Sequence, residues 1–287
     1  MSQFFLVALG FVAALTATVV IARLRVREEE RRFTSFGLML MFVGLVMIGW
    51  WLGTRGVKVE DRLIHPSILP SHVEVLKSFP VLHEQQELVR SIFVSFQRVA
   101  TGFILAVIFA LPLGIYMASY PPMESFFRPL ELVSAYVPLV VFLPLTLAWW
   151  GLAESQKIGF LAICCFVSLL PLVIKTVRGV PQAYLDVAVT KGASQWQLVY
   201  KVLFPVAFAD LWDHMRGVFG IGWSWIIMAE VVNATKGLGH LIDVSNKRNH
   251  TDSIFAIVIV IIAVAIICDY AWKTAGDFLF PYRKKSK

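Results

Sequence analysis

Charge, cysteine and nucleotide-binding motifs are all scarce in this sequence. Charged residues make up 16% of the 287 residues, whereas about a quarter is typical of a soluble globular domain. The three cysteines, Cys164, Cys165 and Cys268, form no CxxC pair, and we interpret them as small residues facing lipid or core. No GxxxxGK[ST] phosphate loop occurs, which excludes ATP hydrolysis through that motif.

Histidine and clustered catalytic groups are scarce as well. The six histidines show no paired metal spacing, and no cluster of His, Asp, Ser or Cys falls at one depth in the apolar runs. We therefore predict no metal, no cofactor and no catalytic residue. The net charge of +7 does not indicate nucleic acid, because recognition helices, aromatic–basic interleaving and zinc spacing are missing.

Hydrophobic residues, in contrast, are abundant and run together. They make up 58% of the sequence, and the mean hydropathy is +0.73. A bilayer core of about 30 Å needs about 20 consecutive apolar residues in a helix. The sequence has seven runs of this kind, at 4–22, 33–52, 92–119, 130–150, 158–174, 206–229 and 254–272. The predicted fold class is an all-α, polytopic transmembrane helical bundle surrounded by membrane lipid.

Composition divides the chain into four parts. Residues 1–32 hold the first run and a basic stretch, and we interpret this run as a retained anchor because no basic region precedes it. Residues 33–90 hold the second run and a polar loop. Residues 91–272 hold the other spans, and residues 273–287 form a basic tail.

The distribution of basic residues predicts the orientation in the membrane. Fifteen of the 26 Lys and Arg lie in the connections 23–32, 120–129, 175–204 and 273–287. Connections rich in Lys and Arg face the cytoplasm. We therefore predict that these four are cytoplasmic and that 53–90, 151–157 and 231–253 face the other side.

The polar loop 53–90 contains a helix-start signal. Ser71 is followed three residues later by Glu74, the spacing of a capping box in which each side chain accepts a hydrogen bond from the other residue's backbone N–H. A short amphipathic helix through Val75, Leu76 and Phe79 should follow, lying on the membrane surface.

The connection 181–205 has an unusual pattern for a cytoplasmic loop. Helical spacing over 184–190 is followed by Gly192, which permits a turn with positive φ, and by Ser194, which can cap a second helix running to Pro205. The apolar residues of its first helix would be costly to leave in water. Two interpretations stay open, a helix lying flat among lipid headgroups and a helix that docks on a partner protein.

This connection resembles the EAA loop of ABC importer permeases, the binding-protein-dependent transport system inner membrane components. Asp186-Val187-Ala188 takes the place of Glu-Ala-Ala, Gly192 is the glycine, and Val202 and Phe204-Pro205 close the motif at the family spacing. Asp, Val, Val and Phe replace the usual Glu, Ala, Ile and Leu.

Other stretches of 66–272 are similar to the same family, and to its nitrate/sulfonate/taurine/bicarbonate-type branch in particular. They are Ser95 to Phe103, Pro112-Leu113-Gly114, Pro138 with Pro144-Leu145 and Trp149-Trp150-Gly151, and Trp223 with Ala229-Glu230 and Gly237-Leu238-Gly239. The resemblance implies a six-span permease core, so that the run 4–22 is one extra N-terminal span.

The resemblance also implies a function and a set of partners. Two permease copies, expected to be a homodimer, would form the path through the bacterial inner (cytoplasmic) membrane, with two copies of a separate ABC ATPase beneath. A periplasmic or lipoprotein solute-binding protein would deliver a small, anionic solute such as nitrate, a sulfonate, taurine or bicarbonate. The cytoplasmic coupling loop 181–205 would pass ATPase motion to the spans as alternating access. Its expected residues are Tyr184, Leu185, Asp186, Val187, Ala188, Gly192, Ala193, Ser194 and Pro205.

Ionisable residues inside spans raise a functional hypothesis by default, because they are expensive there. Arg98, Arg216 and Glu230 are therefore predicted residues of a translocation path, and Trp223, an aromatic residue of the same run as Arg216, is predicted to line it as well. The alternative is structural pairing of the arginines, for example with Glu131, Asp210 or Asp213, or snorkelling to the interface. A stand-alone secondary transporter or channel is the alternative function, but it would favour inverted repeats, and none is evident.

Overall fold

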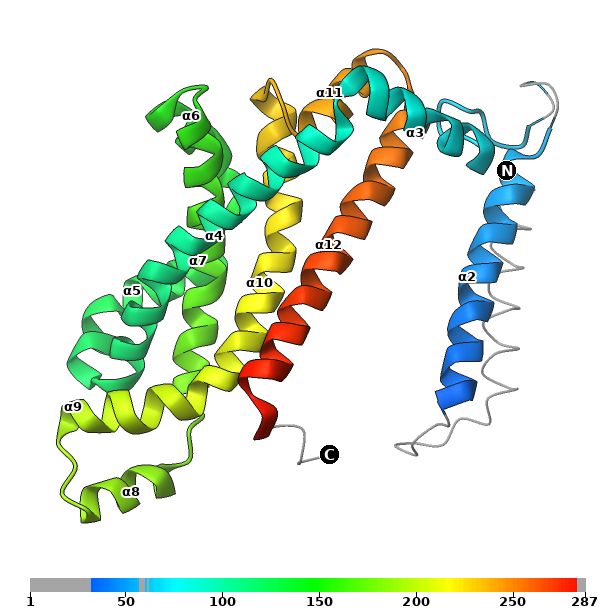
Figure 1. The fold of residues 1–287 in the computed structure, drawn as a ribbon. Helices are drawn as coiled ribbons and strands as arrows, with labels where there is room; N and C mark the ends of the chain where they lie inside the picture. Colours follow the sequence, from blue (N-terminus) through cyan, green and yellow to red (C-terminus); the bar gives the residue numbers. More distant parts are fainter. Residues whose placement is uncertain (1–31, 57–59, 61, 283–287) are drawn as a thin grey trace. The chain divides into compact units, whose positions relative to one another are not determined.

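The computed structural model describes residues 32–56, 60 and 62–282, which contain helices and no strand (Figure 1). The long helices are α2 (Arg32–Thr54), α4 (Leu88–Ser119), α7 (Glu154–Arg178), α10 (Phe204–Asn233) and α12 (Thr251–Leu279). The shorter ones are α3 (His72–Gln86), α5 (Pro121–Tyr136), α6 (Phe142–Trp150), α8 (Gln182–Thr190), α9 (Gln195–Leu198) and α11 (Leu238–Lys247). The predicted all-α class is confirmed. The predicted anchor at 4–22 and the last five residues of the basic tail, 283–287, lie outside the described residues.

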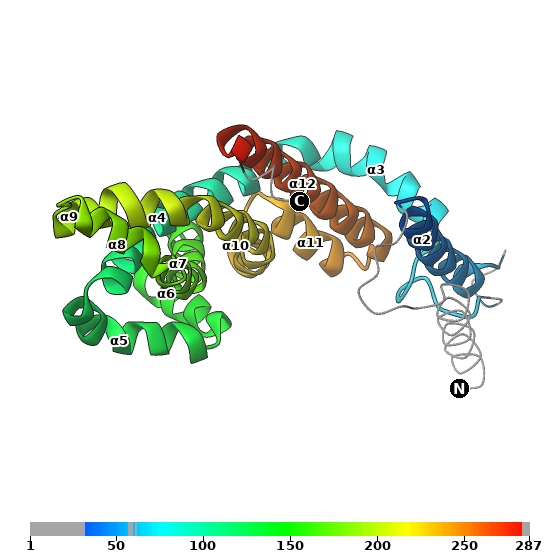
Figure 2. The ribbon, with the colours of Figure 1, turned by 90° about the horizontal axis from the view of Figure 1, so that it is seen from below.

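The chain forms two compact units. The first comprises residues 1–82 with 245–256, and the second comprises 83–244 with 257–287. Within the second unit, α7 is the central helix and packs against α4, α10, α5 and α6 (Figure 2). The predicted functional residues all belong to this second unit.

Among the described residues, five stretches are long and apolar enough to cross a membrane. They are Phe36–Thr54, Leu88–Ser119, Glu154–Arg178, Gln195–Val232 and Thr251–Leu279. A sixth crossing results if the bent pair Pro121–Ser134 and Leu139–Trp150 counts as one span. These helices agree with five of the predicted runs in position, although several extend further at their ends.

The predicted span over 130–150 is not one straight helix but falls within a bent pair of helices, which counts as one crossing only if the pair is taken together. The two helices of this region meet at an angle of 89°. Val137, which precedes a proline, has extended dihedrals (φ −80°, ψ 125°), and the ring of a proline disfavours the α conformation of the preceding residue. Pro138 also has an extended ψ of 118°. The run is apolar enough for a span, but its proline stops the first helix.

Close approach of α4 and α7 depends on two glycines of α4. A Cβ built on Gly102 would lie 2.9 Å from Leu161 Cβ, and one on Gly114 would lie 2.6 Å from Val173 Cγ1. Leu161 and Val173 are both fully buried. Small residues let membrane helices approach closely, so that van der Waals contact stabilises their packing.

We expect the substitution Gly114→Ala to destabilise the protein by about 1–3 kcal/mol, the usual cost of overpacking a core. The β-branched Val173 has few alternative rotamers in a helix and cannot move aside freely. The measurement is unfolding in mixed micelles followed by tryptophan fluorescence.

Gly217→Ala in α10 is the matched control, because nothing lies within 4 Å of its added Cβ. Removing a helical glycine there should stabilise the protein by roughly 0.5–1 kcal/mol. Equal effects of the two substitutions would contradict the close-packing argument.

In the first unit, the predicted capping box is confirmed. The backbone N–H of Ser71 donates to Glu74 Oε2 (2.9 Å), and the N–H of Glu74 donates to Ser71 Oγ (3.3 Å). The predicted helix is α3, with Val75 buried and Leu76 exposed. Trp50 Nε1 donates to the carbonyl of Pro70 (2.8 Å), which attaches the start of α3 to the end of α2.

The Glu74 carboxylate also binds Arg62, a partner that the sequence pattern did not indicate. Arg62 donates through both terminal nitrogens to Glu74, at 3.1 and 2.8 Å. This paired hydrogen bonding from Arg62 lowers the pKa of Glu74 from 4.5 to about 2, and bonds from Ser71 add to the effect. Glu74 therefore binds its proton less readily in the folded state than in the unfolded chain.

A lowered pKa makes stability depend on pH with a defined sign. The contribution of the Glu74 ion pair is complete above pH 4.5 and disappears as the pH falls towards 2. We expect wild type to melt at a higher temperature than Glu74→Gln at pH 6, because glutamine keeps a capping side chain but loses the charge.

The quantity to measure is the difference in melting temperature between the two proteins across pH 6 to 2.5, since other carboxylates cancel in it. The difference should shrink as the pH falls. A difference that stayed constant over this range would contradict the assignment.

Candidate functional site

The candidate coupling segment leaves α7 and returns to α10 at one end of the second unit. Figure 1 shows α8 and α9 below the lower end of α7, at the end from which α10 rises. Gly179 ends α7, Pro181 precedes α8, and residues 191–194 turn the chain into α9. The two helices predicted around Gly192 are confirmed.

Gly192 ends α8 in a Schellman motif. Its φ is +80°, its N–H donates to the carbonyl of Val189 (2.9 Å), and the N–H of Ala193 donates to the carbonyl of Ala188 (3.0 Å). These are the two bonds of the motif, which needs a left-handed residue where glycine carries no steric penalty. The turn predicted from the sequence therefore has a defined geometry.

Ser194 then caps α9, as predicted. Gln197 N–H donates to Ser194 Oγ (3.4 Å), and Ser194 N–H donates to Gln197 Oε1 (2.9 Å). The two motifs follow each other without a free residue between them, so the connection between the two helices has little conformational freedom.

The helix α8 buries none of its residues. Tyr184, Val187 and Val189 are 54–56% exposed, while Leu185 and Ala188 are half-buried. Asp186 accepts a hydrogen bond from Gln182 Nε2 (3.1 Å) one turn earlier. A helix of nine residues with apolar side chains exposed around it is not stabilised by its own contacts.

The predicted start of a span at Pro205 needs correction. The chain is helical without interruption over Gln195–Val232, and Pro205 lies in the first turn of α10. A π-helical turn, η3 (Val199–Leu203), precedes it. Proline removes one backbone N–H and crowds the preceding turn, and a widened π turn accommodates such a break within a helix.

A buried ion cluster lies towards the opposite end of the second unit. Arg98 of α4 is 4% exposed and Glu230 of α10 is fully buried. Arg98 Nη1 donates to Glu230 Oε1 (2.7 Å) and to the carbonyl of Lys236 (2.8 Å). Its Nε and Nη2 donate to the two oxygens of Glu154 in α7, at 2.7 and 2.6 Å. The guanidinium thus joins three helices.

The remaining bonds to Glu230 explain the glycines that follow it. Ser95 Oγ lies 2.8 and 2.9 Å from the two carboxylate oxygens, and the N–H of Gly239 donates to Oε2 (2.8 Å). A Cβ on Gly237 or on Gly239 would come within 2.5 Å of Glu230 atoms. The stretch Gly237-Leu238-Gly239 therefore wraps tightly around the carboxylate.

The pairing alternative for Arg98 is favoured in this structure, with partners other than those suggested. Arg98 binds Glu154 and Glu230. Arg216 binds Asp269 of α12, with Nη2 2.7 Å from Oδ2. Trp223 is 2% exposed and packs near Phe96. A role of these residues in a translocation path stays a prediction.

Two polar residues at the start of α7 were missed by the sequence analysis. Residues 151–157 were predicted to be a loop, but α7 begins at Glu154. Lys157 is 2% exposed, with Nζ 3.4 Å from the carbonyls of Leu152 and Ala153, and Gln156 is fully buried. The apolar run that starts at 158 was the only available signal, and it does not show that a helix begins one turn earlier.

Apolar spans, a buried ion cluster and an exposed helical connection place this chain in the class of polytopic helical membrane proteins. The chain belongs to the binding-protein-dependent transport system inner membrane component family, which matches residues 110–274, more than half of the chain. The resemblance deduced from the sequence motifs is confirmed.

Several relatives are similar over most of their length. A putative ABC transporter permease of Methanocaldococcus jannaschii is 31% identical, covering 87% of this chain and 93% of the relative. The taurine transport system permease of Escherichia coli is 27% identical (83% and 86% covered). The nitrate import permease of Synechocystis is 31% identical (68% and 74% covered).

The fold is also similar to a solved structure. The inward-facing MetNI methionine ABC transporter contains a chain with a TM-score of 0.61 and 15% identity, covering 67% of this chain and 95% of that one. This chain is therefore an inner-membrane permease component with an ABC importer permease fold. The family match argues against the alternative of a stand-alone transporter or channel.

We expect Arg98→Gln to destabilise the protein by about 3–5 kcal/mol, because it leaves the buried Glu230 carboxylate without its cation. The double variant Arg98→Gln/Glu230→Gln should be more stable than the single one, since the unpaired charge is gone. The measurement is the free energy of unfolding of the wild type and of each variant in mixed micelles.

Arg216→Gln is the matched control. The side chains of Arg216 and Asp269 are 30% and 50% exposed, so this substitution should cost much less. A single variant as stable as its double variant, or a control as damaging as Arg98→Gln, would show that burial of the pair is not the cause.

Proposed function

We propose that the segment 181–205 docks on a separate ABC ATPase and transmits its motion to the spans. The observation that carries this proposal is α8 itself, a helix without buried residues whose apolar Tyr184, Val187 and Val189 are more than half exposed. Seating such a helix in a groove of a partner protein would cover these side chains. The sequence carries no phosphate loop, so the ATPase is a different chain.

The proposed coupling residues are those of the EAA-like motif. Tyr184, Leu185, Asp186, Val187 and Ala188 form the docking helix. Gly192, Ala193 and Ser194 form the joint, whose Schellman turn and capping box restrain the angle between α8 and α9. Because little motion is lost in such a joint, a push on α8 moves α9.

A displacement of α8 that reaches α9 would pass into one long continuous helical stretch, called the rod below. The helical stretch Gln195–Val232 has 38 residues, or about 57 Å at 1.5 Å per residue. Pro205 and the preceding π turn stand at its start. Tilting this rod against α7 would open the path alternately to the two sides of the membrane.

The proposed assembly has two copies of this permease, two ATPase subunits and an external solute-binding protein. In this arrangement α8 faces the cytoplasm, in agreement with the basic residues around it. Arg98, Arg216, Trp223 and Glu230 keep their proposed place near the path, with the Arg98–Glu230 pair holding the outer end closed.

The proposed solute is a small anion. Relatives named for taurine and for nitrate are similar to most of this chain, and both solutes present a compact group of negatively charged or partially charged oxygens. Alkanesulfonates and bicarbonate have the same character. This substrate class rests on similarity alone and is independent of the coupling proposal.

The substitution Val187→Asp tests the docking helix. We expect the full-length variant, tagged and purified from its own membranes, to lose the P-loop ATPase that co-purifies with wild type. Cellular uptake of at least one tracer among taurine, an alkanesulfonate, nitrate and bicarbonate should fall to the level of a gene deletion. Both losses follow from placing a charge in an apolar interface.

Ile68→Asp is the matched control, because Ile68 is 70% exposed and lies outside the segment. This variant should keep the ATPase. A Val187→Asp variant that retained both ATPase and uptake would refute the coupling proposal. Normal uptake of all four tracers by the deletion strain would refute only the substrate class.

A further inference from the structure

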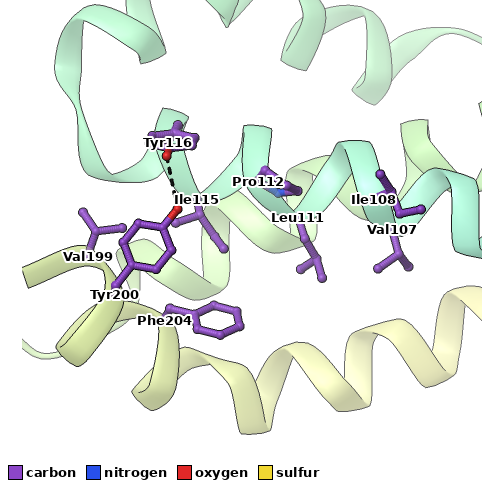
Figure 3. A pocket seen from close by; sticks show the side chains of 9 residues that line it. All are labelled: Val107, Ile108, Leu111, Pro112, Ile115, Tyr116, Val199, Tyr200 and Phe204. Atoms are coloured by element: carbon purple, nitrogen blue, oxygen red, sulfur yellow. Dashed lines mark hydrogen bonds between the residues drawn. The ribbon is translucent and has the colours of Figure 1, made fainter. Parts of the chain in front are cut away.

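A groove lies on the second unit where α4 passes the start of α10. Its volume is about 310 Å³. Val107, Leu111 and Ile115 line it from α4, and Val199, Tyr200 and Phe204 line it from the π turn and α10 (Figure 3). Apolar side-chain atoms form nearly all of the groove's surface.

The polar atoms of the groove gather at one end. The hydroxyls of Tyr116 and Tyr200 hydrogen-bond to each other across it at 3.2 Å. In Figure 3 this pair closes one end, and Val107 and Ile108 mark the other. A ligand that fits has a long apolar part and one end that tolerates hydroxyl groups.

The groove has the length of one membrane leaflet. Its α4 side runs from Val107 to Tyr116, which corresponds to about 14 Å at 1.5 Å per residue. Half of a hydrocarbon core of about 30 Å is about 15 Å. Because α4 is long and apolar enough to cross a membrane, an apolar surface on it is suited to contact with lipid tails.

The tyrosine end carries the features of a membrane interface. Tyr120 stacks on Tyr116 with ring centroids 6.1 Å apart. Trp196, which is 56% exposed, lies 4.2 Å from the Tyr200 ring. Lys201, which follows Tyr200 in the sequence, is also exposed. Tyrosine and tryptophan favour the headgroup level, and lysine there attracts lipid phosphate.

We propose that this groove binds one acyl chain of a phospholipid from the leaflet on the α8 side, with the headgroup beside the Tyr116–Tyr200 pair. A spanning helix of a second copy fits less well. Such a helix is about 10–12 Å wide and crosses the full 30 Å core, whereas the groove ends after one leaflet. The bound chain contacts the π turn through which α9 joins α10.

The test uses the full chain in vesicles of phosphatidylethanolamine and phosphatidylglycerol containing a small fraction of lipid with a diazirine in its acyl chain. After illumination, mass spectrometry maps the labelled residues. We expect label on Leu111 and on 199–204 to exceed label on Ile104 and Phe109 severalfold. Ile104 and Phe109 lie outside the groove but are 55% and 64% exposed, so contact with bulk lipid favours the opposite order.

The variant Leu111→Trp fills the groove and should lower the labelling of 199–204 severalfold. Phe109→Trp, on the open face of α4, should leave it unchanged. The wild-type map tests the proposal even if Leu111→Trp fails to fold.

Labelling that simply follows exposure would mean ordinary surrounding lipid and would overturn the site. A groove without label, together with cross-links between copies or to another part of the chain, would mean that protein covers it and would overturn the proposal equally.

Discussion

The packing of the second unit depends on one buried ion pair, Arg98 with Glu230. Charges this deep are tolerated only when every hydrogen-bonding atom finds a partner. Arg98 therefore also binds Glu154 and a backbone carbonyl, and Glu230 also binds Ser95 and a backbone N–H. Satisfying both groups brings together α4, α7, α10 and the turn after α10. Gly237 in that turn is required because a Cβ there would overlap the Glu230 carboxylate, and Gly239 because a Cβ there would overlap Glu230 Cβ and the carbonyl of Ile227.

The ion cluster and the candidate coupling segment are connected through one helix. The continuous stretch Gln195–Val232 begins beside the joint at Ser194 and carries Glu230 near its far end. A displacement at α8 would therefore be resisted, or released, at the Arg98–Glu230 pair. The proposed lipid groove lies against the π turn at the start of the same stretch, which is the part of the rod with the least regular hydrogen bonding.

Local signals in the sequence were reliable guides to structure. The capping boxes at Ser71 and Ser194 and the turn at Gly192 all form as predicted, because each depends on bonds between residues at most five positions apart. Prolines in or beside apolar runs were less reliable guides to where a helix ends. Pro138 breaks an apolar run, whereas Pro205 sits inside a continuous helix, and hydropathy alone does not separate these two situations.

The sequence by itself determined that this chain is a helical membrane protein and which family it resembles, because span length and motif spacing are properties of consecutive residues. Only the tertiary structure decided the partners of its buried charges. Glu154 and Glu230 are 56 and 132 positions from Arg98, and several other carboxylates were equally plausible candidates. The burial of Lys157 likewise could not be predicted from the sequence, since it depends on how α7 packs among its neighbours. Charge pairing inside a bundle is set by which helix faces meet, and a linear sequence does not specify those contacts.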